Sequence, residues 1–262
     1  MRAAARRAPG PMLGVLLALA ACGGGPPPLD LPPGAMVLRL AEQDDVPTLD
    51  PAIGYDTLSW TFEQMLYSTL VRYGDANVEI EPDIATRWEI SPDARTLTFH
   101  LRTDARFANG RTVESEDFKY AIERVLKPST RSKGAEFFRG LLGAPEFVDG
   151  KVMAVAGIET PDAHTITFRL VTPDPLFVHK LTMPFAAAIP REVAEKWGED
   201  FSRHAVGSGP FKLHQWTGGQ RIVLVRNRDY HVAGVPRLDA VEVRLGVSDE
   251  LEWLKFEAGE ID

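Results

Sequence analysis

Cysteine is almost absent from this sequence: 262 residues contain a single one, Cys22. One thiol excludes a disulfide framework, a zinc site built from cysteines and an iron–sulfur cluster. Basic residues are also in deficit, with 29 Lys and Arg against 37 Asp and Glu and a formal net charge of -8. An acidic surface repels phosphate backbones, so we expect no nucleic-acid partner.

The motifs of common enzymes are missing as well. There is no phosphate-binding glycine loop and no Gly-x-Ser-x-Gly elbow, and no two of the six histidines share a metal-ligand spacing on one helix. The run Gly207-Ser208-Gly209 places a serine between glycines, but Pro210 then lacks the N–H that an oxyanion hole needs. We therefore predict no enzyme, no catalytic residue, no metal site and no cofactor.

The composition is that of a mixed globular protein. Hydrophobic residues make up 44% of the chain and charged residues 25%. This balance supports at least one core and argues against wholesale disorder. The length allows one or two domains.

The N-terminus has the pattern of an export signal. Three arginines precede an apolar run, Met12–Ala21, whose ten residues are too few to cross a bilayer as a helix. The run ends at Leu19-Ala20-Ala21-Cys22, which is a lipobox. We predict a lipoprotein signal peptide over 1–21 and lipidation at Cys22; the alternative is a buried cysteine in an ordinary helix. Losing three arginines and no acid takes the net charge from -8 to -11.

Glycine and proline dominate the segment after Cys22, so 22–35 is predicted to be a tether between a membrane and the folded part. Strand-like alternation covers 36–42, and a helix is expected over 57–70. A second helix is expected over 115–127, with Ser115 as its N-cap and Pro128 as its stop. The later part predicts further elements: a helix over 191–197, strands over 211–216, 221–226 and 240–245, and an amphipathic helix over 248–258 capped by Ser248.

Two segments repeat each other, Ser91–Leu101 and Thr160–Leu170. Each has a Pro-Asp turn followed by alternating apolar residues. The expected strands 84–90 and 152–159 precede them. We predict two β-hairpins that pair into one half-buried antiparallel sheet, covered by the helix over 115–127.

Short motifs along nearly all of 36–262 together resemble those of the family 5 extracellular solute-binding proteins, the oligopeptide and dipeptide receptors of ABC importers. They are Thr48-Leu49-Asp50-Pro51-Ala52, Leu66–Val71, Pro82–Glu89, Thr98–Arg102, Phe107–Gly110, Glu116–Arg124, Gly207–Leu213, Arg226–Tyr230 and Gly259-Glu260-Ile261-Asp262. Their order and spacing are more specific than any single match. One departure is His231, where the family usually has an aromatic residue.

The resemblance implies a mixed α/β fold: the first lobe of a type II periplasmic-binding-protein clamshell over 36–262, with a hairpin and helix subdomain inserted at about 72–180. The second lobe is expected to be missing. It further implies a peptide ligand, ABC permease subunits as partners, and a monomer in the periplasm or cell envelope, anchored to the membrane through lipidated Cys22.

The resemblance also suggests ligand contacts. The loop after the first strand faces the cleft in the family; here it contains Asp44, Asp45, Val46 and Pro47. The Gly207-Ser208-Gly209 loop approaches the same cleft, and Tyr55 offers an aromatic wall, as Trp60 could. A solvated acidic turn, an ordinary turn into a strand and core packing are the respective alternatives.

Other functions stay open from the sequence alone. The same fold can bind nickel, haem, sugars or antibiotics. The chain could also be a truncated remnant that binds nothing, or a surface lipoprotein with hydrolase activity.

Overall fold

A computed structural model describes residues 31–74 and 78–262. The chain divides into two units, Met1–Gly34 and Ala35–Asp262, and the second is compact. The predicted signal peptide, Cys22 and most of the tether lie outside the described residues. The domain boundaries, including the subdomain at about 72–180, therefore stay predictions.

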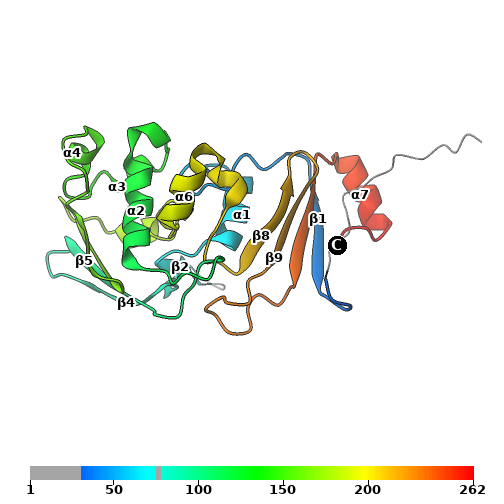
Figure 1. The fold of residues 1–262 in the computed structure, drawn as a ribbon, viewed down its shortest axis with the longest axis horizontal. Helices are drawn as coiled ribbons and strands as arrows, with labels where there is room; N and C mark the ends of the chain where they lie inside the picture. The colour runs from blue at the N-terminus through cyan, green and yellow to red at the C-terminus, as the bar shows by residue number, and fades with distance from the viewer. Residues whose placement is uncertain (1–30, 75–77) are drawn as a thin grey trace, which may run out of the picture. The chain divides into compact units, whose positions relative to one another are not determined.

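Ala35–Asp262 has a mixed α/β fold, as predicted (Figure 1). The strands are β1 (Val37–Glu42), β2 (Val71–Tyr73), β3 (Ile80–Pro82), β4 (Ala85–Ile90), β5 (Thr96–Leu101), β6 (Ile158–Asp162), β7 (Thr165–Arg169), β8 (Phe211–Thr217), β9 (Arg221–Arg226) and β10 (Ala240–Leu245). The helices are α1 (Thr57–Leu66), α2 (Ser115–Leu126), α3 (Ala135–Phe138), α4 (Ala144–Val148), α5 (Phe177–Lys180), α6 (Arg191–Trp197) and α7 (Asp249–Glu257), with 3-10 turns η1 (Pro128–Thr130), η2 (Pro184–Ala186) and η3 (Gly198–His204).

Two four-stranded sheets flank the helices α1, α2 and α6 (Figure 1). One has the order β1-β10-β9-β8, in which β1 is parallel to β10 and the other neighbours are antiparallel. The end of the chain reaches the free edge of β1, where the Asp262 N–H donates to the Arg39 carbonyl at 2.8 Å. This contact occupies part of an otherwise unpaired strand edge.

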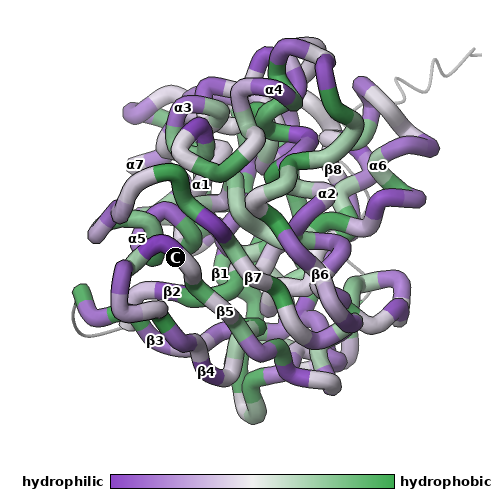
Figure 2. The backbone as a smooth tube through the Cα atoms, turned by 90° about the vertical axis from the view of Figure 1, so that its left-hand side faces the viewer, coloured by the Kyte–Doolittle hydropathy of each residue, from purple (hydrophilic) through white to green (hydrophobic). Residues whose placement is uncertain are grey.

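The repeated segments form the centre of the other sheet, which has the antiparallel order β4-β5-β7-β6. Leu97 pairs with Phe168 and Phe99 with Ile166, so the two repeats lie directly side by side. All four side chains are buried. The alternation of hydrophobic and hydrophilic residues along β5 and β7 can be followed in Figure 2. The predicted pairing of two hairpins is confirmed.

The hairpin prediction was wrong in one detail. The expected strand over 152–159 begins only at Ile158, and the strand β6 continues through Pro161 and Asp162. The pairing with β7 shifts register between Glu159 and Asp162. Proline is tolerated here because β6 is an edge strand, where its missing N–H breaks no ladder bond.

Helix α2 covers this sheet with its buried face, which includes Phe118, Ile122 and Val125. Its N-cap is Glu114 and not the predicted Ser115. The Glu114 N–H donates to the Asp117 carboxylate at 2.8 Å, and the Glu114 side chain accepts from the Asp117 N–H, which completes a capping box. Ser115 is buried and donates instead to the Asp162 carbonyl at 2.6 Å.

Helix α1 ends four residues earlier than the sequence predicts, at Leu66. Tyr67 already has extended backbone angles, and its hydroxyl donates to the Leu49 carbonyl at 2.9 Å. The segment that follows leads into β2 at Val71. Tertiary packing therefore overrides the helical apolar spacing over 67–70.

The last helix, α7, begins as predicted with Ser248 accepting from the Leu251 N–H. The predicted amphipathic helix buries no apolar face, since none of its residues is buried. The exposed fractions of Trp253, Leu254 and Phe256 are 61%, 58% and 54%. The remaining predicted elements of the later part, α6, β8, β9 and β10, lie within one residue of their expected bounds.

Candidate ligand-binding site

One face of α1 borders three neighbouring hollows. Thr57, Trp60, Thr61 and Gln64 recur at helical spacing on this face. Gln64 lines all three hollows, so they follow one another along the helix. We call this series of hollows the α1 groove.

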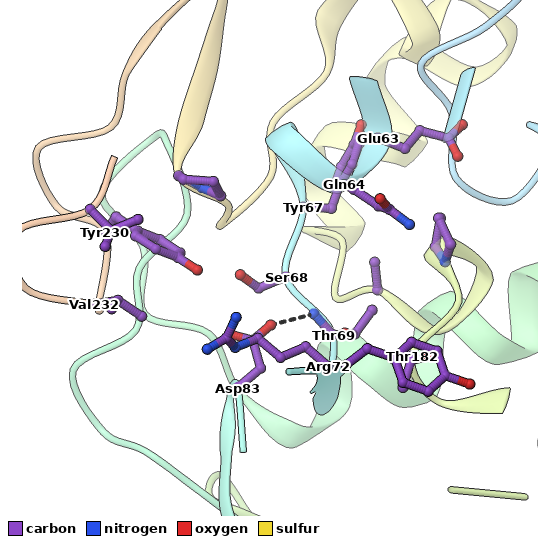
Figure 3. Close-up of a pocket in the computed structure, with 15 residues that line it drawn as sticks. Glu63, Gln64, Tyr67, Ser68, Thr69, Arg72, Asp83, Thr182, Tyr230 and Val232 are labelled. Carbon is purple, nitrogen blue, oxygen red and sulfur yellow. Dashed lines mark hydrogen bonds between the residues drawn. The ribbon is translucent and has the colours of Figure 1, made fainter. Parts of the chain in front are cut away.

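The largest hollow has a volume of about 560 Å³ and lies at the C-terminal end of α1 (Figure 3). Its wall comes from segments far apart in the sequence: the end of α1, β2, η2 and the connection between β9 and β10. The lining residues are Glu63, Gln64, Tyr67, Ser68, Thr69, Arg72, Tyr73, Asp83, Thr182, Pro184, Ala187, Pro210, Tyr230, Val232 and Val235. Hydroxyls, an amide and aromatic rings line the same space, which suits a ligand with both polar and apolar parts.

Two charged groups of this hollow, Asp83 and Arg72, are already engaged. Asp83 accepts from the Thr69 N–H at 3.0 Å and contacts His231 Nε2 at 2.7 Å. Arg72 forms an ion pair with Glu81 at 3.0 Å. Burial, followed by the nearby Asp83 carboxylate, raises the pKa of Tyr230 to about 12. Tyr230 therefore keeps its proton at neutral pH and can donate a hydrogen bond.

The His231–Asp83 pair accounts for the unusual histidine found in the sequence. The side chains of both residues are almost fully buried, at 1% and 6% exposed. Tyr230 packs against the His231 ring, with 4.3 Å between ring centroids. The imidazole thus takes an aromatic packing position and adds a polar bond between the β9–β10 connection and the segment before β4.

The other two hollows are more aromatic. One, of about 510 Å³, includes Trp60, Tyr73 and Phe137 in its wall, and the other, of about 390 Å³, includes Tyr55. Tyr55 stacks on Phe185 at 6.0 Å and meets Trp60 edge-on at 6.2 Å. Half of Tyr55 is exposed, so its outer part is accessible from solvent.

The predicted acidic loop lies at a different place. Asp45 accepts from the Gly219 N–H at 2.8 Å and from Trp216 Nε1 at 3.3 Å, which ties the loop to the β8–β9 turn. Val46 is buried in the core, whereas Asp44 and Pro47 are exposed. Contact of this loop with a ligand stays a prediction.

The glycine loop 207–209 packs against the end of α1. The Gly209 N–H donates to the Leu66 carbonyl at 2.9 Å. A Cβ on Gly207 would lie 1.9 Å from the Leu66 oxygen, so no side chain fits there. Ser208 is fully buried. These glycines permit a close approach of two backbone segments, and their contact with a ligand also stays a prediction.

The predicted site residues thus fall into three groups around the fold. Tyr55 lies just before α1 and Gly209 at its far end, about 15 Å away at 1.5 Å per residue. Sequence reasoning did not select Gln64, Phe137, Tyr73 and Met183. The spacing of Thr57, Trp60, Thr61 and Gln64 could have indicated one accessible helix face, but the distant segments opposite it carry no local pattern.

No group of three or more His, Cys, Asp and Glu side chains in the described part of the chain is placed to hold a metal ion. None of the helices in that part of the chain has the length and hydropathy of a membrane span.

Known proteins match this chain in sequence. Residues 79–262 match the family model of bacterial extracellular solute-binding proteins, family 5 Middle. The probable D,D-dipeptide-binding periplasmic protein DdpA of Escherichia coli is 32% identical over 235 residues, covering 86% of this chain and 42% of that protein. The periplasmic oligopeptide-binding protein OppA of Escherichia coli is 31% identical over 186 residues, covering 69% of this chain and 34% of that protein.

Solved structures match the fold. The OppA structure from Burkholderia pseudomallei has a TM-score of 0.77 at 28% identity, covering 87% of this chain and 46% of that one. The murein tripeptide binding protein MppA of Escherichia coli gives a TM-score of 0.79 at 28% identity, with 87% and 45% covered. The chain spans less than half the length of the relatives it matches. The chain belongs to the family 5 bacterial extracellular solute-binding proteins.

Proposed function

We propose that this chain is part of the substrate-binding component of a peptide-type ABC importer, which captures oligopeptides or dipeptides outside the cytoplasmic membrane and delivers them to the permease. The observation that carries the proposal is the likeness to the OppA fold, with a TM-score of 0.77. The relatives named above are solute-binding proteins and not enzymes, which favours this function over the hydrolase alternative.

The α1 groove supports a peptide as the ligand class. Gln64 offers both a donor and an acceptor to a peptide backbone, and Tyr55 and Trp60 offer apolar surface to side chains. The Asp44–Pro47 loop and the 207–209 loop are proposed as further contacts. Because this chain covers less than half of the matched relatives, further contacts from the rest of such a protein fit this proposal.

A non-peptide ligand is the second candidate. The probable deoxycholate-binding periplasmic protein YgiS of Escherichia coli is 28% identical over 231 residues. The aromatic walls around Tyr55 and Phe137 would suit an apolar ligand of that kind.

Calorimetric titration of the full chain separates the two candidates. One arm uses a mixture of di-, tri- and pentapeptides, and the other uses deoxycholate below its micelle concentration. Saturable heat with the peptides alone supports the proposed function. Saturable heat with deoxycholate alone would replace it with the second candidate.

Anchoring through Cys22 is proposed to hold the protein at the membrane. The lipobox at Leu19–Cys22 and the periplasmic location of the named relatives support this. The acidic balance of the chain gives it no general electrostatic attraction to anionic lipids.

A further inference from the structure

A further hollow is lined by the α6–η3 segment and β8. Its volume is about 350 Å³. It shares no lining residue with the α1 groove. We call it the α6–β8 hollow.

The charged and titratable side chains that line this hollow are an arginine and two histidines. Arg203, His204 and His214 are all exposed, and no Asp or Glu is among the lining residues. This lining contrasts with the net charge of -8 of the chain. Guanidinium and imidazole N–H groups are donors suited to an anion.

Two tryptophans hold two of these donors, Arg203 and His204, in place. The Arg203 guanidinium lies over the Trp216 ring, 3.7 Å from its centroid. The His204 ring stacks on Trp197, with 3.3 Å between centroids and 12° between the planes. Side chains packed in this way lose less rotamer freedom when a ligand binds, which favours affinity.

The neighbouring acid, Asp45, already accepts three hydrogen bonds. Asp45 accepts hydrogen bonds from Val46 N–H, Trp216 Nε1 and Gly219 N–H. Arg203 and Asp45 both lie beside Gly218, but none of the ion pairs among the described residues includes Arg203. Its guanidinium therefore keeps donors available for a ligand.

We propose that the α6–β8 hollow binds a solute bearing an anionic group, a carboxylate or a phosphate, attached to an apolar body. Arg203 and the two imidazoles donate to the anionic oxygens. The half-buried Trp197 and Trp216 provide the apolar wall. This inference does not depend on peptide binding in the α1 groove.

NMR titration of the full chain with benzoate, phenyl phosphate and neutral benzamide tests the proposal. The anions should shift the indole N–H of Trp216 and the imidazole signals of His204 and His214 saturably, and benzamide should not. A lower Kd for phenyl phosphate would identify phosphate as the preferred group, and a lower Kd for benzoate would identify carboxylate.

Arg203→Gln should raise the Kd of the anions at least tenfold, because it removes a charge-assisted donor. Arg95→Gln is the matched control, since Arg95 is exposed on the β4–β5 hairpin, and it should change the Kd less than twofold. His214→Asn gives a second variant at an exposed position, with an expected loss of about threefold or more. Equal affinity for benzamide and benzoate, unchanged affinity in both hollow variants, or no saturable shift would overturn the proposal.

Discussion

Glu63 is the residue whose environment is least suited to its charge. It lies on the buried side of α1, and neither carboxylate oxygen has a hydrogen-bond partner among the described residues. Burial raises the pKa of Glu63 to about 8, and the nearby Asp50 and Asp56 carboxylates add to the effect. The folded protein therefore holds a neutral carboxyl at this position at pH 7.

Because the pKa of Glu63 is raised on folding, we predict that the free energy of unfolding decreases as the pH rises. The unfolded chain loses the Glu63 proton near its ordinary pKa of 4.5, whereas the folded chain keeps it until about 8. The contribution is fully present below 4.5 and is lost as the pH rises through 8, at up to about 1.4 kcal/mol per unit. The two pKa values differ by 8 − 4.5, about 3.5 units, so Glu63→Gln should remove this dependence and add on the order of 4 kcal/mol at pH 8.

Urea denaturation between pH 5 and pH 8 measures the effect. The exposed Glu146→Gln is the control and should leave the pH dependence of the parent chain unchanged. An equal slope in Glu63→Gln and in the parent would show that Glu63 is not the group responsible.

Gly207 predicts a second effect at the residue scale. Gly207→Ala would push a methyl group into the Leu66 carbonyl, so it should lower the free energy of unfolding by about 2–3 kcal/mol. Gly140→Ala, where nothing lies within 4 Å of the new Cβ, should change it by less than about 0.5 kcal/mol. Similar thermal midpoints for the two variants would refute the packing role given to Gly207.

Residue-scale chemistry was the hardest to predict from the sequence. The lipobox and the family motifs were readable because they are local patterns. By contrast, His231 and Asp83 are 148 positions apart, so no local sequence pattern predicts that they pair. The same holds for Glu63, whose buried state depends on the approach of Gly54.

At the scale of elements, the start of α2 shows how a cap is chosen. Both Glu114 and Ser115 precede the apolar spacing, and propensity favours serine. Ser115 is instead buried against β6 and is the first residue of the helix. The N-cap therefore lies one position earlier than predicted, at Glu114, and its capping partner is Asp117. Tertiary contacts decided between two adjacent candidates.

Glu114→Ala should therefore destabilise the protein by about 1 kcal/mol, because the Asp117 N–H at the start of α2 loses its side-chain acceptor. Glu114→Ser retains an acceptor and should recover most of the loss. Thermal unfolding followed by circular dichroism gives the comparison. A neutral Glu114→Ala would contradict the capping box.

Strands and helices with strong periodicity were predicted well. The repeated β5 and β7 alternate apolar and polar residues, and each buries one face, so their pairing followed from the sequence. Two predictions failed at the ends of elements. Residues 67–70 were predicted as helix but lie after the end of α1, and residues 152–157 were predicted as strand but lie before β6. Both segments are shaped by distant partners and not by their own pattern.

At the scale of the whole molecule, the fold class was predictable because many weak motifs occur in order. The α1 groove was not predictable, since the wall of its largest hollow combines α1, β2, η2 and the β9–β10 connection. A groove assembled from four distant segments has no signature in any one of them. The Asp44–Pro47 loop, the 207–209 loop and the α1 groove are therefore all proposed as ligand contacts.

Membrane attachment is proposed to depend on lipidation of Cys22. Cys22→Ser should abolish acylation and move the protein from the membrane fraction to the soluble fraction of the cell envelope, because no other lipid anchor is proposed. Mass spectrometry of the N-terminal peptide checks the modification. A Cys22→Ser protein that still sediments with membranes would contradict the proposed anchor.

Direct measurement of peptide affinity tests the central claim. Calorimetry of the full chain with a peptide that binds the parent should show a Kd at least fivefold higher for Gln64→Ala, since Gln64 lines all three hollows of the α1 groove. Gln220→Ala, an exposed glutamine in the β8–β9 turn, should match the parent. Peptide binding that Gln64→Ala leaves unchanged, or a correctly folded chain that binds no peptide, would contradict the account.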